Sequence, residues 1–176
     1  MGKSMSELNQ TIGSDAHAAP FQPRPVTVSR RYPNAPMVGT GVAIFNDESH
    51  VLLVKSGKPG RKHPWGLPGG LLDLGERLVD GARREVWEEC QVEVDLGDVV
   101  HIFEPIDWDE DGNIEYHFVV VDFWANYRSG TPTPGDDIVD VAWCAIDALA
   151  SYNLMTASHE AIHKAHTAWQ NARQQS

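Results

Sequence analysis

Cysteine is scarce in this sequence, with two residues, Cys90 and Cys144, among 176. They form no C-x-x-C pair and no disulfide framework, so a disulfide-stabilised secreted fold is excluded. Long apolar runs are also missing: residues 118–125 form the longest one, contain an aspartate and fall far short of a bilayer span. The first twenty residues lack the apolar centre of a secretory signal. We therefore expect a cytoplasmic protein with no membrane-spanning segment.

Positive charge is also sparse, because 14 Lys and Arg face 25 Asp and Glu, a net charge of −11. This balance argues against duplex nucleic acid or a membrane surface as a partner. Residues 73–115 carry 15 acidic residues against three arginines and need a counter-ion. A short basic segment precedes them, formed by Lys55, Lys58, Arg61 and Lys62. Together the two segments suit an anionic ligand held beside a metal ion, although a solvated basic loop fits the composition equally well.

The length and the 41% apolar content suit one globular domain. Residues 1–36 show no sustained period and predict a flexible N-terminal segment, followed by one domain over residues 37–176. Apolar spacings of 3, 4 and 4 predict a helix over residues 78–90. The other expected elements are strands at 37–45, 51–54, 99–106, 115–125 and 141–146, a loop at 57–70, and a helix at 158–173 capped by Ser158. This pattern predicts an α/β domain with one helix on either side of a mixed sheet.

Three carboxylates share one face of the helix predicted at 78–90. Glu85, Glu88 and Glu89 stand at i, i+3 and i+4, and like charges at this spacing destabilise an isolated helix. No lysine on this face relieves the repulsion. Hard oxygen ligands suit Mg²⁺ or Mn²⁺, so the spacing leaves two interpretations open, a metal site and a solvated acidic face.

Residues 70–92 read GLLDLGERLVDGARREVWEECQV. This segment resembles the Nudix box, G-x5-E-x7-R-E-U-x-E-E-x-G-U, of hydrolases that cleave nucleoside diphosphates linked to another group. The positions that match are Gly70, Glu76, Arg84, Glu85, Val86, Glu88, Glu89 and Val92. Gln91 replaces the one missing glycine, which implies a different or strained helix end. The likeness extends over about residues 38–149 and includes WGLPGG at 65–70.

The resemblance implies a Nudix-type α/β/α sandwich and an enzyme that uses Mg²⁺, or Mn²⁺, to hydrolyse a pyrophosphate bond. In the family's pattern Glu85 and Glu89 are the principal metal ligands and Glu88 assists them. The carbonyl of Gly70 or its neighbour completes the set of ligands. Arg84 orients Glu85, and Glu76 is structural.

The resemblance does not fix the substrate. The string at 116–125 is similar to the ADP-ribose-pyrophosphatase-like branch, so ADP-ribose, cleaved to AMP and ribose 5-phosphate, is the first choice. One alternative is a nucleoside triphosphate such as 8-oxo-dGTP, with release of pyrophosphate. Another is a non-catalytic nucleotide-binding module, against which the intact Arg84 and glutamates argue. Family members often dimerise, and residues 1–36 are a candidate segment for a homodimer contact.

Two loops are expected to complete the site. Arg61 and Lys62, with Gly69 of WGLPGG, are predicted to bind the substrate's phosphates. The loop at 127–140 contains Asp136 and Asp137, and carboxylates committed to a metal ion are poor bases. We favour Asp137 as the group that positions or deprotonates the attacking water. Glu85 and an acid from 107–111 are the alternatives.

Two further patterns point to ordinary structure. Residues 107–112 match the first half of an EF-hand loop, but Phe118 stands where a bidentate glutamate is required. His159, His163 and His166 repeat at helical spacing and are expected to be surface residues of the last helix. Neither pattern predicts a metal site.

Overall fold

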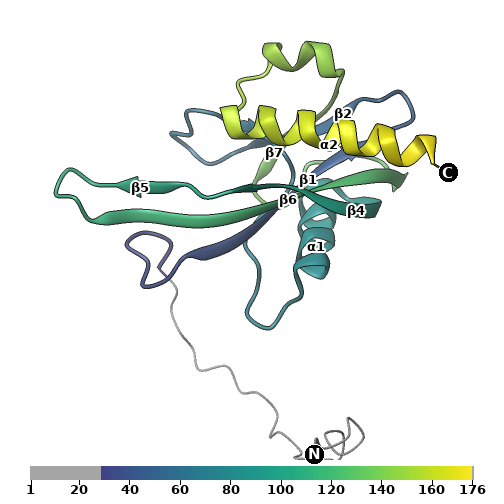
Figure 1. Cartoon of the computed structure of the whole chain (residues 1–176). Helices are drawn as coiled ribbons and strands as arrows, with labels where there is room; N and C mark the ends of the chain where they lie inside the picture. Colours follow the sequence, from purple (N-terminus) through teal and green to yellow (C-terminus); the bar gives the residue numbers. More distant parts are fainter. Residues whose placement is uncertain (1–28, 176) are drawn as a thin grey trace, which may run out of the picture.

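The computed structural model describes residues 29–175, so residues 1–28 of the predicted N-terminal segment lie outside it. Figure 1 shows two helices packed on a sheet from which a long two-stranded arm projects. The elements are β1 (Met37–Phe45), β2 (Val51–Ser56), β3 (Trp65–Gly66), α1 (Leu78–Cys90), β4 (Val92–Phe103), β5 (Ile106–Trp108), β6 (Ile114–Gly130), β7 (Ile138–Cys144), the 3-10 helix η1 (Ile146–Ser151) and α2 (Thr156–Gln174).

The sheet is mixed. Its strand order is β3-β2-β1-β6-β4, with β5 paired to β6 and β7 paired to β2. β1 and β6 are parallel, and the other pairs are antiparallel. β1 and β2 meet only at Phe45 and Val51 and then diverge. Below that point the 68–70 loop bonds to the free edge of β1, because Thr40 N–H donates to Gly70 O and Val42 N–H donates to Pro68 O.

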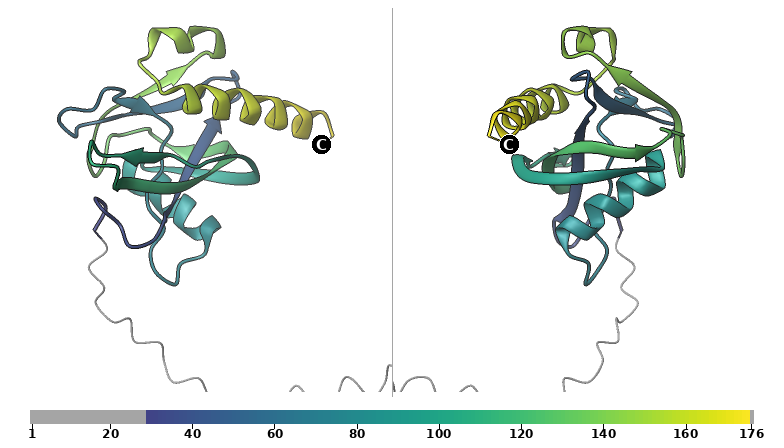
Figure 2. Two further views of the ribbon diagram at one scale, coloured as in Figure 1. Left: turned by 60° about the vertical axis from the view of Figure 1, so that its left-hand side comes forward. Right: turned by 90° about the vertical axis from the view of Figure 1, so that its right-hand side faces the viewer.

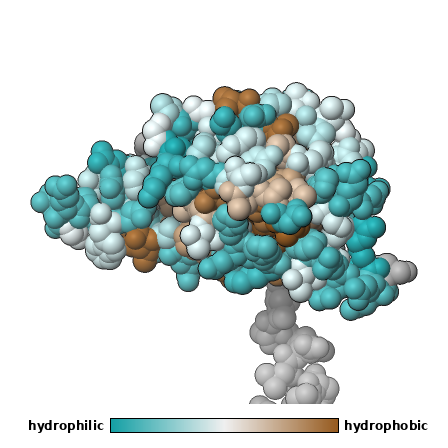
Figure 3. Space-filling view, turned by 90° about the horizontal axis from the view of Figure 1, so that it is seen from above, coloured by the Kyte–Doolittle hydropathy of each residue, from teal (hydrophilic) through white to brown (hydrophobic). Residues whose placement is uncertain are grey.

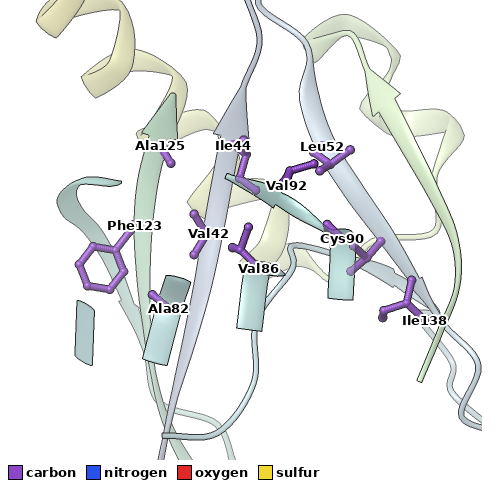
Figure 4. Packing of buried hydrophobic residues seen from close by; sticks show 11 residues of the cluster. Val42, Ile44, Leu52, Ala82, Val86, Cys90, Val92, Phe123, Ala125 and Ile138 are labelled. Atoms are coloured by element: carbon purple, nitrogen blue, oxygen red, sulfur yellow. The ribbon is translucent and has the colours of Figure 1, made fainter. Parts of the chain in front are cut away.

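One apolar cluster joins α1 to its face of the sheet. Ala82, Val86 and Cys90 are fully buried on α1 and pack against β1 and β2 (Figure 4). The residues of this cluster that come from the sheet include Val42, Ile44, Leu52, Phe123 and Ala125. The apolar residues that recur along α1 thus form the face that packs on the sheet. The glutamates lie on the remaining surface of the helix.

A second cluster joins α2 to the opposite face. Ile162, Ala165 and Trp169 of α2 pack against Phe45 and Leu53. The views in Figures 1 and 2 agree that α1 and α2 cover opposite sides of the sheet. The predicted α/β/α arrangement with a mixed sheet is confirmed. Seen from above, the surface around α2 is mostly hydrophilic, with small separate apolar patches (Figure 3).

Several element boundaries differ from the prediction. The helix at 78–90 has the predicted bounds, but β4 begins at Val92, seven residues before the predicted strand at 99–106. Pro105, which lacks an N–H, separates β4 from β5 and ends that predicted strand early. β6 runs on to Gly130, and β7 covers 138–144 in place of 141–146.

The start of α2 also differs. The helix begins at Thr156 after Met155, and no side chain caps it, so the predicted cap at Ser158 is wrong. His163 is exposed as expected, but His166 is half-buried and stacks on Trp169 with ring centroids 5.9 Å apart. Within residues 29–175, no helix is both long enough and apolar enough to cross a membrane.

Residues 29–36 contact the projecting arm formed by β5 and the start of β6. The Arg31 guanidinium lies 2.8 Å from the Glu115 carboxylate, and the Tyr32 backbone N–H donates to Glu115 O. The Tyr32 hydroxyl donates to Asp109 at 3.1 Å. Arg31, which precedes the first strand, therefore has a partner in the domain.

Gln91 ends α1 in the left-handed conformation, with φ 55° and ψ 36°. Its N–H donates to Trp87 O, which satisfies one of the last carbonyls of the helix. The family's glycine at this position adopts such a conformation without strain, whereas a residue with a Cβ does so at a cost of about 1 kcal/mol. The strained helix end implied by Gln91 is thus present in the structure.

We predict that Gln91→Gly stabilises the protein by about 0.5–1 kcal/mol, because it removes the left-handed strain. The measurement is the urea dependence of unfolding, followed by circular dichroism. Gln91→Ala is the control, since it deletes the side chain but keeps the Cβ, and it should give no gain. Equal stability of the glycine and alanine variants would contradict the explanation.

Candidate active site

The carboxylates of α1 differ in their exposure. The side chain of Glu88 is 48% exposed, that of Glu85 is 13% exposed, and Glu89 is buried. The apolar face of α1 lies on the sheet, so Glu85 and Glu89 are at the border between the helix and the WGLPGG loop. Two carboxylates are thus placed where water solvates them poorly.

Arg84 organises the acidic side of this site. Its Nε and Nη2 donate to the two carboxylate oxygens of Glu76 at 2.8 and 2.9 Å, a bidentate pair. Its Nη1 donates to Glu85 at 2.7 Å and to Glu88 at 3.0 Å, and Nη2 also donates to Leu71 O. The Arg84 guanidinium holds the pKa of Glu76 well below its usual range, at about 2. Arg84 therefore joins the loop before α1 to the helix and orients Glu85.

Two adjacent glycines bring the loop backbone against the carboxylates. Gly69 N–H donates to Glu89 at 2.9 Å, and a Cβ on Gly69 would lie 2.0 Å from Thr40 O. A Cβ on Gly70 would lie 2.3 Å from a Glu85 oxygen. Gly69 also has a φ of 152°, a backbone conformation that side chains rarely adopt. Both positions require glycine for this close approach.

The burial of these acids shifts their pKa values. Desolvation raises the pKa of Glu89 to about 7, the nearby charges of Glu85, Asp137 and Asp136 add to the rise, and the Gly69 hydrogen bond opposes it. Desolvation also raises the pKa of Glu85, against the opposing effect of Arg84. The site carries more negative charge than its own cations neutralise.

The 131–137 loop brings Asp136 and Asp137 beside these glutamates. Asp137 forms an ion pair with Lys58, which lowers the pKa of its carboxyl. Gly57 N–H donates to Asp137 O at 2.7 Å. This bond joins the loop after β2, which carries the basic residues, to the 131–137 loop. Asp136 has a φ of 46°, the left-handed region that aspartate tolerates better than most residues.

A cleft of about 650 Å³ contains these groups. It lies where β1 and β2 diverge and extends toward the start of α2. The predicted site residues that line it are Arg61, Lys62, Gly69, Gly70, Glu85, Glu88, Glu89 and Asp137. Arg84 contacts Glu85 and Glu88 of this lining. The structure thus brings all the sequence-predicted site residues to one place, with Arg61 and Lys62 exposed at the surface.

The donor set fits a hard divalent cation. The available groups are carboxylate oxygens and loop carbonyls, which Mg²⁺ and Mn²⁺ prefer. In the part of the chain that the structure describes, no three His, Cys, Asp or Glu side chains enclose a metal position as they stand. The reason is that Arg84 draws Glu85 and Glu88 toward itself while Glu89 faces Gly69. A cation bound here would require the carboxylates to turn toward it, and Glu88, at 48% exposed, is the least enclosed of the three.

Comparison with known proteins decides the family. The sequence profile described as the NUDIX domain matches residues 35–169. The chain belongs to the Nudix family. It is similar to a MutT-like protein of Streptomyces ambofaciens, with 23% identity over 113 residues, which are 64% of this chain and 66% of that protein. It is also similar to an ADP-ribose pyrophosphatase of Methanocaldococcus jannaschii, with 24% identity over 128 residues, 73% of this chain and 72% of that one.

A solved Nudix structure has the same fold. The MutT Nudix hydrolase from Burkholderia pseudomallei superposes with a TM-score of 0.63 at 28% identity, covering 74% of this chain and 98% of its own. The predicted membership of the Nudix family is therefore confirmed, together with the α/β fold. The chain spans just under two thirds of the Streptomyces protein, 66% of its length.

Some residues of the cleft were not predicted. Thr40, Gly41 and Asp122 line it from β1 and β6, although none of them belongs to the Nudix box. The available signal in the sequence was the charged Asp122 inside the otherwise apolar run at 118–125. Periodicity does not show that β6 pairs with β1, so it could not place Asp122 in the cleft.

The raised pKa of Glu89 predicts how the metal-free protein responds to pH. The folded state binds this proton more tightly than the unfolded state, so the Glu89 penalty is absent well below pH 4.5, grows as the pH rises from 4.5 to about 7, and is constant above that. Glu89→Gln should therefore stabilise the metal-free protein at pH 8 by on the order of 2 kcal/mol, and this gain should fall to about a quarter of that value near pH 5.

Thermal and urea unfolding at both pH values, in the presence of EDTA, measure this effect. Glu110→Gln at the exposed turn of the arm removes the same charge and serves as the control. Mg²⁺ should stabilise the parent protein more than Glu89→Gln. A gain that is independent of pH would show that burial of the Glu89 charge is not its cause.

Proposed function

We propose that this Nudix hydrolase cleaves the pyrophosphate bond of a nucleoside diphosphate linked to another group, with Mg²⁺ as its metal and ADP-ribose as its first-choice substrate. The products are then AMP and ribose 5-phosphate. The observation that supports this proposal best is the pair of poorly solvated carboxylates, Glu85 and Glu89, in the same cleft as the cations Lys58, Arg61 and Lys62. Such a cleft suits a bound pyrophosphate together with a divalent ion.

In this proposal Glu85, Glu88 and Glu89, with the carbonyl of Gly70 or its neighbour Gly69, hold the metal ion. When bound, the ion neutralises phosphate oxygens and activates a water for in-line attack at phosphorus. Arg84 keeps Glu85 in place and binds the loop that carries the two glycines. Mn²⁺ satisfies the same oxygen ligands.

The cationic loop is proposed to bind the phosphates. Arg61 and Lys62 line the cleft with their charges exposed, so an anion can reach them. Gly69 leaves no side chain between the loop backbone and the substrate. Charged donors of this kind bind phosphate oxygens more strongly than neutral ones.

The second candidate is pyrophosphohydrolysis of a nucleoside triphosphate such as 8-oxo-dGTP. The similarity to the Streptomyces MutT-like protein and to the Burkholderia MutT structure supports this candidate. The similarity to the ADP-ribose pyrophosphatase of Methanocaldococcus supports ADP-ribose. A non-catalytic nucleotide-binding role is less well supported, because Arg84 and the three glutamates of α1 are all in place. A homodimer and a cytoplasmic location remain proposals.

The first test is turnover with Mg²⁺ over ADP-ribose, NADH, diadenosine polyphosphates and ordinary or oxidised dNTPs. We expect AMP from ADP-ribose, detected by chromatography. Glu85→Gln and Glu89→Gln should each lower kcat by at least about 100-fold, because each removes a charged metal ligand. Glu110→Gln should match the parent. Near-parental turnover by either α1 variant at saturating Mg²⁺ would overturn the metal assignment, and a preference for dNTPs would favour the second candidate.

Asp137 is proposed to position or deprotonate the attacking water. Its ion pair with Lys58 keeps the carboxyl ionised, because Lys58 lowers its pKa. Glu85 and Asp107, the latter also in the cleft, are the alternatives.

The pH profile of kcat tests this role. Asp137→Asn should lower kcat and remove the acidic limb of the profile, whereas Asp136→Asn should change kcat little. Lys58→Gln deletes the partner that lowers the Asp137 pKa, so it should shift the acidic limb to higher pH. If the acidic limb is unchanged in both Asp137→Asn and Lys58→Gln, the base lies elsewhere.

A further inference from the structure

A buried acid lies in the cleft away from the Nudix box. Asp122 of β6 is 7% exposed and faces His101 of β4, which is 9% exposed, across the antiparallel pair. His101 Nδ1 lies 3.0 Å from Asp122 Oδ2. On the α2 side, His101 Nε2 lies 3.8 Å from Glu160. One oxygen of Asp122 is thus held by an imidazole that is itself fixed between the sheet and the helix.

The other oxygen of Asp122 has no hydrogen-bond donor among the described residues. Asp122 Oδ1 lies against the backbone of Gly41, where a Cβ would stand 2.2 Å away. Asp122, Gly41 and Leu67 all line the cleft. The Asp122 side chain is 10% exposed, so this oxygen has little water around it and is open to a donor from a ligand in the cleft. Burial raises the pKa of Asp122, and His101 and the charge of Lys164 oppose this rise.

Gly41 also connects this acid to the catalytic end of the cleft. A Cβ on Gly69, whose N–H binds Glu89, would lie 2.9 Å from the Gly41 Cα. Gly41 therefore contacts both the loop that holds Glu89 and the carboxylate of Asp122. A ligand whose phosphates lie at Gly69 can reach Asp122 along the same cleft.

The chemistry of the two ends differs. The cations Arg61 and Lys62 line the cleft with the Nudix carboxylates, whereas Phe103 and Val120, paired next to His101 and Asp122, add apolar side chains to the lining at the other end. A carboxylate in such surroundings repels phosphate and accepts hydrogen bonds from neutral donors. Aromatic walls suit a flat ring or the apolar face of a sugar.

We propose that Asp122, positioned by His101, selects the uncharged, donor-bearing end of the nucleotide substrate. The donors that fit are an amino group on a base or the hydroxyls of a ribose. This inference rests on the proposed function for the placement of the phosphates, but it assigns the opposite end of the ligand. Asp122 acts as a specificity residue, and His101 as the positioning residue that fixes its orientation.

The first experiment measures binding without turnover. In a Glu89→Gln background, calorimetric titration with AMP, IMP and 2′-deoxy-AMP compares an amino base, a 6-oxo base and a sugar that lacks one hydroxyl. Loss of a hydrogen bond to a charged partner corresponds to a change of about 10-fold to 100-fold in Kd. Weaker binding of IMP identifies the base amine as the donor, and weaker binding of 2′-deoxy-AMP identifies the sugar. Adding Asp122→Asn should abolish whichever preference the background shows.

Kinetics on the preferred substrate provide the second measurement. Asp122→Asn should raise KM by at least about 10-fold while kcat changes less than threefold. His101→Gln should raise KM by a smaller factor. Gly41→Ala keeps the acid but displaces its carboxylate, because the new Cβ would lie 2.2 Å from Oδ1, and it should also raise KM. Asp98→Asn, an exposed acid on β4, is the matched control with no effect.

The outcomes separate the inference from the proposed function. If Asp122→Asn lowers the Tm but leaves KM and the ligand preferences unchanged, Asp122 and His101 are only a core pair and the inference is wrong. Equal binding of AMP, IMP and 2′-deoxy-AMP by the background protein also overturns it. Preferential binding that depends on Asp122, without turnover of any substrate in the screen, supports the inference and refutes the proposed function.

Discussion

The guanidinium of Arg84 is the interaction on which the acidic site depends. It contacts three carboxylates and a loop carbonyl at once, so one side chain fixes the helix, the loop before it and Glu85 relative to one another. A lysine has no planar fork and cannot replace these bonds. Without them, partly desolvated like charges would drive the loop from α1. The arginine of the Nudix box therefore holds this part of the fold together.

The apolar packing sets the limits within which Arg84 acts. Ala82, Val86 and Cys90 fix one face of α1 on the sheet, which leaves Glu85 and Glu89 at the edge of the cleft whether or not a ligand is present. Burial destabilises the charged form of Glu89, and a cation bound beside it would relieve that penalty. A cation that bound only the folded state would recover part of the lost stability, and the recovery would grow with the logarithm of its affinity.

Much of this arrangement could be predicted from the sequence, and the reasons for failure are physical. The bounds of α1 and the left-handed Gln91 follow from local rules. β4 was predicted too short although Val92, Val94 and Leu96 alternate with exposed acids, and Ser158 was assigned as a cap that the backbone does not use. The position of Asp122 in the cleft depends on the pairing of β6 with β1. That pairing joins residues far apart in the sequence, which local patterns do not reveal.

The parallel pairing of β1 with β6 also has a kinetic consequence. It joins Met37 to Phe118 and Phe45 to Asn126, so most of the domain must be enclosed before the central strands can meet. Contacts of such long sequence separation are slow to form, because chain entropy is lost before they contribute. Gly41 and Asp122, which line the cleft from β1 and β6, come together only when these two strands have paired. During synthesis, the emerging chain must therefore expose the partner-free edge of β1 until residue 126 has left the ribosome.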